Sequence, residues 1–290
     1  MHWRLQWRAV VFALAFMGVP SLASAQADQN PPPPPQIDQT VVNVPTTLSL
    51  QKHHSYFRLT HRFARDLRRG SFGQLAEDLF SLDSGAIIGL EYRFGITSNL
   101  QAGVHRSIFN KTIQTFGRWD AFTQGGALPI GLSIGGSFEG ANNMHQDYQP
   151  AVFASVSHTA GRWIALYASP AYVHHSHTNT LLELHEGHSH DIPGEEGAAD
   201  EQVDKRDTFY VGLGARMRIL PSTFIVGEAS PRLVGYTPDR AAWNVGIEAQ
   251  THGHVLQLNF GNNFATTPGM IARGGDKSAV YLGFNLSRKW

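Results

Sequence analysis

Residues 208–219 read TFYVGLGARMRI, an alternation of apolar residues with polar or small ones. Successive side chains of a β-strand point to opposite faces, so this strand has one apolar face and one face with Arg216, Arg218 and two glycines. A soluble protein would have to cover the apolar face with a second layer. In a membrane, lipid covers that face and the polar face lines a closed barrel. The stretch therefore predicts a strand of a transmembrane β-barrel.

Similar alternation recurs along the chain and predicts an all-β fold of about twelve strands. Two of them alternate less regularly, because Phe116 and Phe224 fall on the polar face. The predicted strands lie near residues 54–64, 85–95, 98–108, 112–122, 128–139, 148–158, 162–174, 207–220, 222–233, 241–251, 254–264 and 278–290.

The links between these strands alternate in length. Turns rich in Gly, Pro, Ser or Thr occur at 96–98, 124–127, 159–161, 221–222 and 251–253. Longer links lie between them at 65–84, 140–147, 175–206, 234–240 and 265–277. The link at 109–111 is short where a long one is expected. Short periplasmic turns and longer extracellular loops are typical of a closed antiparallel outer-membrane barrel. A soluble β-sandwich or secreted barrel, the alternative, has no reason to sort its links by length.

The chain begins with the pattern of a secretory signal, namely two arginines, an apolar core at 9–19 and small residues at 23–25. Five consecutive prolines at 31–35 favour polyproline II, and they predict a flexible periplasmic segment. We therefore expect three parts, a signal peptide at 1–25, a Pro-rich flexible segment at 26–50 and an outer-membrane β-barrel at 51–290.

The composition argues against several other classes. The chain has no cysteine, so neither a disulfide framework nor a lipid-modified cysteine is available. No stretch after the signal approaches the roughly eighteen consecutive apolar residues of a transmembrane helix. The formal net charge is +0, and it provides no basic excess for nucleic acid.

The last residues, 279–290, read AVYLGFNLSRKW and end on the aromatic Trp290. An apolar alternation with a terminal aromatic resembles the C-terminal strand that the barrel assembly machinery recognises in outer-membrane proteins. Arg288 departs from that pattern, although an arginine that snorkels is tolerated at a membrane edge. The expected partners are therefore outer-membrane lipid and, through the strand ending at Trp290, the assembly machinery.

Four stretches carry a broader resemblance: HRF at 61–63, LFSLDSGAIIGLEYR at 79–93, GITSNLQAGVHRS at 95–107 and KT at 111–112. They resemble a family of outer-membrane β-barrels of Gram-negative bacteria that is known only as a domain of unknown function. The resemblance extends from about residue 50 onward. It implies a barrel in the outer membrane and brings no known activity.

Charged side chains on the predicted inner faces are the first candidate site. The expected lumen-lining residues are Arg58, Arg62, Glu91, Arg93, His105, Arg118, Glu139, Arg216, Arg218 and Glu248. An unpaired buried charge is costly, so these groups must be hydrated or paired. Two interpretations remain open, a water-filled pore whose arginines favour anionic or polar solutes and a salt-bridge network that fills a narrow barrel.

Histidines accumulate around the start of the longest predicted loop, and they are the second candidate site. Imidazole and carboxylate groups suit zinc or copper. The candidate metal ligands are His174, His175, His177, His185, His188, His190 and Asp191. Their spacing matches no recognised metal site, so a solvated acidic loop is the alternative.

These patterns favour a narrow pore or binding channel for small polar solutes, and not an enzyme. Two alternatives remain open. One is a plugged structural barrel whose His-rich loop binds metal. The other is a barrel-embedded hydrolase, with Ser155 or Ser157 beside His158, or Asp83 or Asp147 with His145.

One long link has a distinct pattern of its own. In residues 65–84, Leu75, Leu79, Phe80 and Leu82 recur at helical spacing. They predict a short amphipathic helix that lies at the membrane surface, closes the mouth of the barrel or packs over its outer rim.

Overall fold

The computed structural model describes residues 35–83, 85–177, 205–235 and 240–290. Within them, thirteen strands form one antiparallel sheet. The strands are β1 (Ser55–Phe63), β2 (Ala86–Gly95), β3 (Leu100–Ser107), β4 (Ile113–Phe122), β5 (Gly131–Gly140), β6 (Gln146–Ala160), β7 (Ile164–His177), β8 (Lys205–Leu220), β9 (Thr223–Ser230), β10 (Arg232–Val234), β11 (Ala242–Thr251), β12 (His254–Gly261) and β13 (Tyr281–Lys289).

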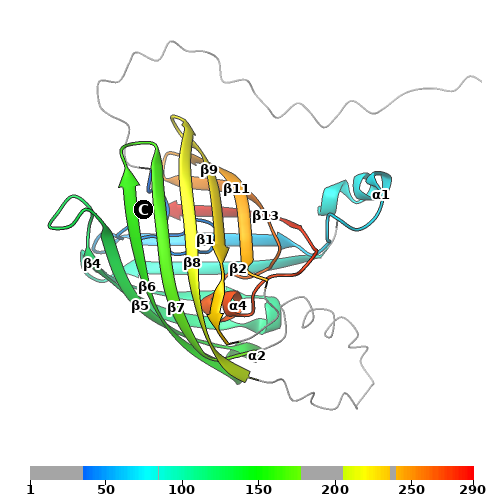
Figure 1. Cartoon of the computed structure of the whole chain (residues 1–290), viewed down its shortest axis with the longest axis horizontal. Coiled ribbons are helices and arrows are strands. Elements are labelled where there is room, and N and C mark those ends of the chain that lie inside the picture. Colours follow the sequence, from blue (N-terminus) through cyan, green and yellow to red (C-terminus); the bar gives the residue numbers. More distant parts are fainter. Residues whose placement is uncertain (1–34, 84, 178–204, 236–239) are drawn as a thin grey trace, which may run out of the picture. The chain divides into compact units, whose positions relative to one another are not determined.

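All of these strands except β10 close into a twelve-stranded barrel (Figure 1). The first strand, β1, pairs with both β2 and β13, and β9 pairs with both β8 and β11, so the sheet has no free edge in the barrel wall. β10 continues β9 beyond Pro231 and pairs with β8. Proline has no backbone N–H to give to the ladder, so one predicted strand at 222–233 divides into two.

The faces of β8 follow the predicted alternation. Leu213 and Met217 are exposed on the outside, and Arg216 and Arg218 are buried on the inside. Phe224 on the next strand also points inward, where the guanidinium of Arg218 lies 4.6 Å from its ring centroid. The cation–π contact and the burial explain why an aromatic residue stands on the polar face.

The outer surface of the barrel is apolar. Exposed aromatic side chains on the strands include Tyr92, Phe94, Trp119, Phe122, Phe138, Tyr148, Tyr172 and Phe260. Such a surface suits the hydrocarbon region and interfaces of a bilayer. In the described part of the chain, no helix has the length and apolar character needed to cross a membrane.

The two ends of the barrel differ in their links. At the end that we call the short-turn end, Ser55 and Trp290 join the first strand to the last through the Ser55 N–H and the Trp290 carbonyl, 2.9 Å apart. The links at this end are 96–99, 123–130, 161–163, 221–222 and 252–253. The opposite end, the long-loop end, holds the links 64–85, 108–112, 141–145, 235–241 and 262–280, and the link that includes 178–204, residues outside the described part.

Two segments occupy the inside of the barrel. Residues 37–50, which we call the plug, are mostly buried, and residues 262–280, which we call the inward loop, carry α4 (Pro268–Ala272) into the lumen (Figure 1). The prediction of a flexible tether at 26–50 is therefore wrong for residues 37–50. The composition of the proline run favours a tether, whereas the residues just after it bind the barrel wall. Residues 1–34, with the predicted signal peptide, lie outside the described part.

A short helix is present in the β1–β2 link as α1 (Phe72–Glu77), but of the four residues that predict it only Leu75 lies within it. Leu79 and Phe80 follow at positive φ, so the predicted helical spacing does not continue to Leu82. Ser71 caps α1 and Gln74 returns the bond, so that a capping box begins the helix. Phe72, Leu79 and Leu82 remain exposed, and α1 lies apart from α4 in Figure 1. α1 and the residues that follow it to Leu82 therefore do not fill the lumen.

Candidate functional site: a lumen occupied from both ends

The plug is a tight reversal of the backbone. The Val41 N–H donates to the Val44 carbonyl (2.8 Å), and the Thr46 N–H donates to the Gln39 carbonyl (2.9 Å). The reversal directs the N–H groups of residues 42–44 and the carbonyls of residues 40, 41, 42, 46 and 48 at the barrel wall. Buried backbone groups need partners, and the wall supplies them.

Glu228 on β9 accepts the N–H groups of the reversal. Its carboxylate oxygens lie 2.9 Å from the nitrogen of Val42, 2.9 and 3.0 Å from that of Asn43, and 2.9 Å from that of Val44. The side chain of Asn244 also donates to it (3.0 Å). Hydrogen bonds to a carboxylate are stronger than those between neutral groups, so Glu228 is the main anionic anchor of the plug.

Arginines of the wall bind the carbonyls of the same reversal. Arg58 Nη1 lies 3.0 Å from the Val42 carbonyl, and Arg216 Nη2 lies 2.9 Å from the Thr40 carbonyl. Arg118 donates to the Thr46 carbonyl (2.8 Å) and to that of Leu48. Two wall amides add to them: Gln257 donates to the Val41 carbonyl (2.7 Å) and Asn285 to the Val42 carbonyl (3.2 Å). The plug is thus held by charged side chains that bind its main chain.

The same arginines are paired with carboxylates of the wall. Arg58 lies 3.0 Å from Glu91, which also pairs with Arg93 at 2.6 Å. Arg216 pairs with Glu248, and both side chains are fully buried. Arg118 Nε lies 2.9 Å from an oxygen of Asp120. In this structure the lumen charges form a paired network, as the second interpretation expects. The same arginines also donate guanidinium N–H groups to the plug inside the lumen.

All ten predicted lumen residues are buried inside the barrel. Arg62 binds the Asn285 side chain (2.8 Å) and reaches Asn43 of the plug (3.3 Å). Arg218 lies near the short-turn end, where it donates to the Arg162 carbonyl (2.9 Å). Both ring nitrogens of His105 lack a hydrogen-bond partner among the described residues.

Apolar contacts also hold the plug, and two glycines of the wall leave space for its valine side chains. A Cβ atom at Gly214 would lie 2.9 Å from Val41 Cγ2, and one at Gly212 would lie 3.0 Å from Val44 Cγ2. Ile37 packs with the inward-facing Phe224 and with Val255. The glycines on the polar face of β8 are therefore positions where the plug approaches the wall closely.

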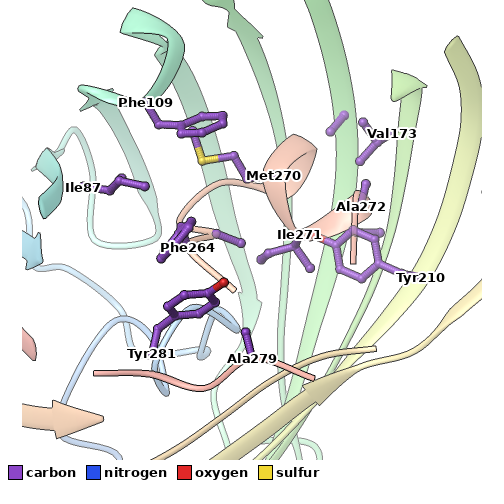
Figure 2. Packing of buried hydrophobic residues seen from close by; sticks show 13 residues of the cluster. Ile87, Phe109, Val173, Tyr210, Phe264, Met270, Ile271, Ala272, Ala279 and Tyr281 are labelled. Atoms are coloured by element: carbon purple, nitrogen blue, oxygen red, sulfur yellow. The ribbon is translucent and has the colours of Figure 1, made fainter. Parts of the chain in front are cut away.

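The inward loop is held mainly by apolar packing. Figure 2 shows Met270 beside Phe109, with Ile271 and Ala272 between Phe264 and the Val173–Tyr210 side of the wall. The members of this cluster are Ile87, Phe109, Ala151, Ala171, Val173, Tyr210, Phe264, Ala265, Met270, Ile271, Ala272, Ala279 and Tyr281. Several of them are inward-facing residues of β2, β6, β7 and β8, so apolar side chains line the part of the lumen that surrounds α4.

Glu139 is the polar anchor of the inward loop. Its carboxylate accepts from the Thr267 hydroxyl (3.0 Å) and the Gly269 N–H (3.2 Å), at the start of α4. Arg273 lies near this carboxylate at the end of α4. Burial lowers the pKa of Arg273 to about 10, and the charge of Glu139 acts in the opposite direction. The guanidinium therefore remains charged at neutral pH.

An internal cavity of about 50 Å³ lies between the plug and the inward loop. Arg58, Glu91, Arg93 and Arg118 line it from the wall, together with Thr40 and Asn43 of the plug and Pro268 and Ile271 of the inward loop. The ring of Phe116 also faces it, 4.9 Å from the guanidinium carbon of Arg93. Space of this size holds only a few waters, so the plug and the inward loop leave little room between them.

The hydrolase candidates are not assembled around Ser155 and Ser157. Ser155 Oγ lies 3.3 Å from Ser169 Oγ, and Ser157 Oγ contacts the Thr47 hydroxyl of the plug, so both serines point inward. His158 is exposed on the other face, 2.9 Å from the Pro129 carbonyl. Asp147 forms an ion pair with Lys205 (2.7 Å).

The predicted metal ligands divide between described and undescribed residues. His174 and His175 lie at the long-loop end of β7, next to Asp207 of β8. His177 is the last residue of β7, and its side chain is not described. His185, His188, His190 and Asp191 lie outside the described residues. Asp207 was missed by the sequence reasoning because it lies on a different strand.

Comparison with known proteins supports the architecture. Residues 38–290 match the family described as a membrane-bound beta barrel domain, DUF5777, and the chain belongs to this family. The matched region includes residues 38–50 of the plug as well as the wall. No curated protein is significantly similar in sequence.

Solved structures with a similar fold include channels and an enzyme. The COG4313 outer membrane channel from Pseudomonas putida F1 has a TM-score of 0.49 at 10% identity, over 83% of this chain and 97% of that one. The NanC porin has a TM-score of 0.48 at 6% identity, over 81% and 97%. Outer membrane phospholipase A from Escherichia coli has a TM-score of 0.42 at 8% identity, over 81% and 90%. The family and the closed barrel make the protein a β-barrel of the outer membrane. In such barrels the short turns face the periplasm, so we assign the short-turn end to that side.

Proposed function

We propose that this protein is an outer-membrane channel for small polar solutes that is closed by its own N-terminal plug. The observation that carries the proposal is the way in which the plug is held. Glu228 and the wall arginines bind its main-chain N–H and carbonyl groups, which are the groups that water or a polar solute can replace. Wall side chains that bind a peptide backbone in this way also suit a hydrated polar solute.

The charges around the plug set the expected preference. The wall residues that would face water after the plug leaves include Arg58, Arg62, Arg93, Arg118, Arg216 and Arg218, with Glu91, Asp120, Glu228 and Glu248. Arginine is in excess, and departure of the plug also removes Asp38, which accepts a bond from Ser287 (2.8 Å). A weak preference for anionic over cationic solutes follows.

A crosslink tests the proposal directly, because the chain has no cysteine of its own. The hydroxyls of Thr47 and Ser157 are in contact, so Thr47→Cys with Ser157→Cys places two thiols where a disulfide would join plug to wall. In planar bilayers we expect the oxidised double variant to show no conductance steps. Reduction should restore the conductance of the unmodified protein. Each single-cysteine variant serves as a control.

Deletion of residues 35–50 is the complementary variant. We expect it to conduct steadily, with a weak anion preference in a salt gradient. Heat-modifiable migration on detergent gels checks that the deleted chain still folds as a barrel. A folded deletion variant that does not conduct, or an oxidised crosslink that conducts as well as the reduced one, would contradict the proposal.

A further inference from the structure

A bulge in the β7–β8 ladder lies at the extracellular end of the barrel. Val173 pairs with Thr208 and Ser176 pairs with Arg206, so the two residues His174 and His175 stand opposite the single residue Asp207. His175 has a φ of 55°, in the left-handed region that a residue with a Cβ seldom adopts. Bulges of this kind redirect a side chain and are over-represented beside functional sites.

The bulge changes where the two imidazoles point. In a regular strand, neighbouring residues point to opposite faces, and their side chains do not meet. Here the rings of His174 and His175 are stacked, with their centroids 3.7 Å apart and their planes at 26°. Each of the two histidines and Asp207 offers a ligand atom, and the three atoms lie within 4.8 Å of one another.

The distances within this group are close to those between ligands of one ion. His174 Nδ1 lies 2.8 Å from an oxygen of Asp207. Two ligands that each lie about 2.0–2.2 Å from a tetrahedral zinc ion are about 3.3–3.6 Å apart, so this pair would open slightly to admit the ion. His174 and Asp207 are each about half-exposed, so water can complete the coordination and the ion can enter from outside.

The carboxylate is also oriented by outer contacts. The Tyr172 hydroxyl donates to Asp207 Oδ2 (2.7 Å), and the His175 N–H donates to Oδ1 (3.1 Å). Such bonds hold a metal-binding carboxylate in place. The nearest lysine in the ladder, Lys205, binds Asp147 at 2.7 Å. Its charge is therefore directed at another carboxylate.

We propose that His174, His175 and Asp207 form a binding site for a divalent transition-metal ion of the zinc or copper class at the extracellular rim. The site is built by the bulge and does not require the remaining loop histidines. It is independent of the plug, so its failure and the failure of the channel proposal are distinguishable.

The test separates the bulge from the loop in the full-length protein in detergent micelles. One variant replaces His177, His185, His188 and His190 with asparagine, and the other carries His174→Asn with His175→Asn. Calorimetric titration with zinc chloride should give one tight site in the first variant and lose it in the second. The exposed His145 provides the matched control, because His145→Asn should leave the titration unchanged.

Two further measurements report the geometry. With copper(II), electron paramagnetic resonance of the loop variant should show coupling to two imidazole nitrogens. Tyr172→Phe, which removes the hydroxyl that orients Asp207, should weaken zinc binding about 10-fold or more. Loss of the tight site in the loop variant, or its persistence in the His174/His175 double variant, would overturn the proposal.

Discussion

The plug and the inward loop both lie inside the barrel, but the balance of forces that holds them differs. The plug binds through its main chain to charged wall residues, with Glu228 as its anionic anchor, and only smaller apolar clusters form around Ile37, Val41 and Val44. The inward loop is packed through Phe264, Met270 and Ile271 against an apolar part of the wall. Glu139 is the carboxylate that anchors it.

This difference indicates which of the two segments can be released from the lumen. Water can replace a polar bond to a backbone group at small net cost, since the contribution of such a bond to stability is about 0.5–1.5 kcal/mol, and more where a charge takes part. Removing an apolar side chain from a packed cluster leaves a cavity that nothing fills equally well. We therefore expect the plug to exchange between bound and released states while the inward loop stays fixed.

The largest expected effect is on the inward loop. Ile271→Ala should lower the free energy of unfolding by about 2–5 kcal/mol, because it opens a cavity in the cluster of Figure 2. Urea unfolding in detergent, followed by tryptophan fluorescence, measures the change. An equal loss of stability on deletion of residues 35–50 would contradict the distinction between the two segments, since the plug would then stabilise the barrel as much as the inward loop does.

The next effect is on the plug. Glu228→Ala removes the acceptor of three backbone N–H groups, and we expect it to weaken plug binding by about 1.5–3 kcal/mol. A maleimide should then label a cysteine at Thr47 at least about tenfold faster than in the parent variant, as 1.4 kcal/mol corresponds to a factor of ten. An unchanged labelling rate would mean that Glu228 does not hold the plug.

A glycine on the inner face of β8 provides a second test of plug binding. Gly214→Ala places a Cβ atom 2.9 Å from Val41 Cγ2, and overpacking of this kind costs about 1–3 kcal/mol. The variant should label faster at Thr47 while its unfolding curve barely changes. Ala215→Val, on the outward face of the same strand, is the matched control and should leave the labelling rate as it was.

The smallest expected effect concerns Phe224. Phe224→Leu keeps an apolar contact for Ile37 but removes the ring under the Arg218 guanidinium. The cation–π contact lies within the wall, so its loss of about 0.5–1 kcal/mol acts on the wall and not directly on the plug. Labelling at Thr47 should therefore rise only slightly, and a rise as large as that of Glu228→Ala would assign Phe224 an equal part in holding the plug.

The alternation that predicts the wall is a local property, and for that reason it could be read from the chain. The inward positions of Arg58, Glu91 and Arg216 follow from a period of two residues alone. The partners of the plug do not. Glu228 and Val44 are 184 residues apart in sequence, and no local pattern links them.

The glycines of β8 were the one available signal for the plug. Gly212 and Gly214 stand on the face that carries Arg216, where a barrel that held only water would have no need of small residues. The sequence nevertheless cannot say which segment approaches them. Residues 37–50 follow a proline run, and that composition alone favours a tether.

By itself, the sequence determined a barrel wall, the sign of the charges inside it and the end at which the histidines lie, because strand periodicity and link length are local. Only the tertiary structure decided that the lumen is occupied, that Glu228 and the wall arginines hold the plug, and that a bulge brings His174 and His175 to Asp207. Each of those features joins residues that are distant in the chain. Pairing of β7 with β8 brings Asp207 to the two histidines, and the barrel wall surrounds the plug.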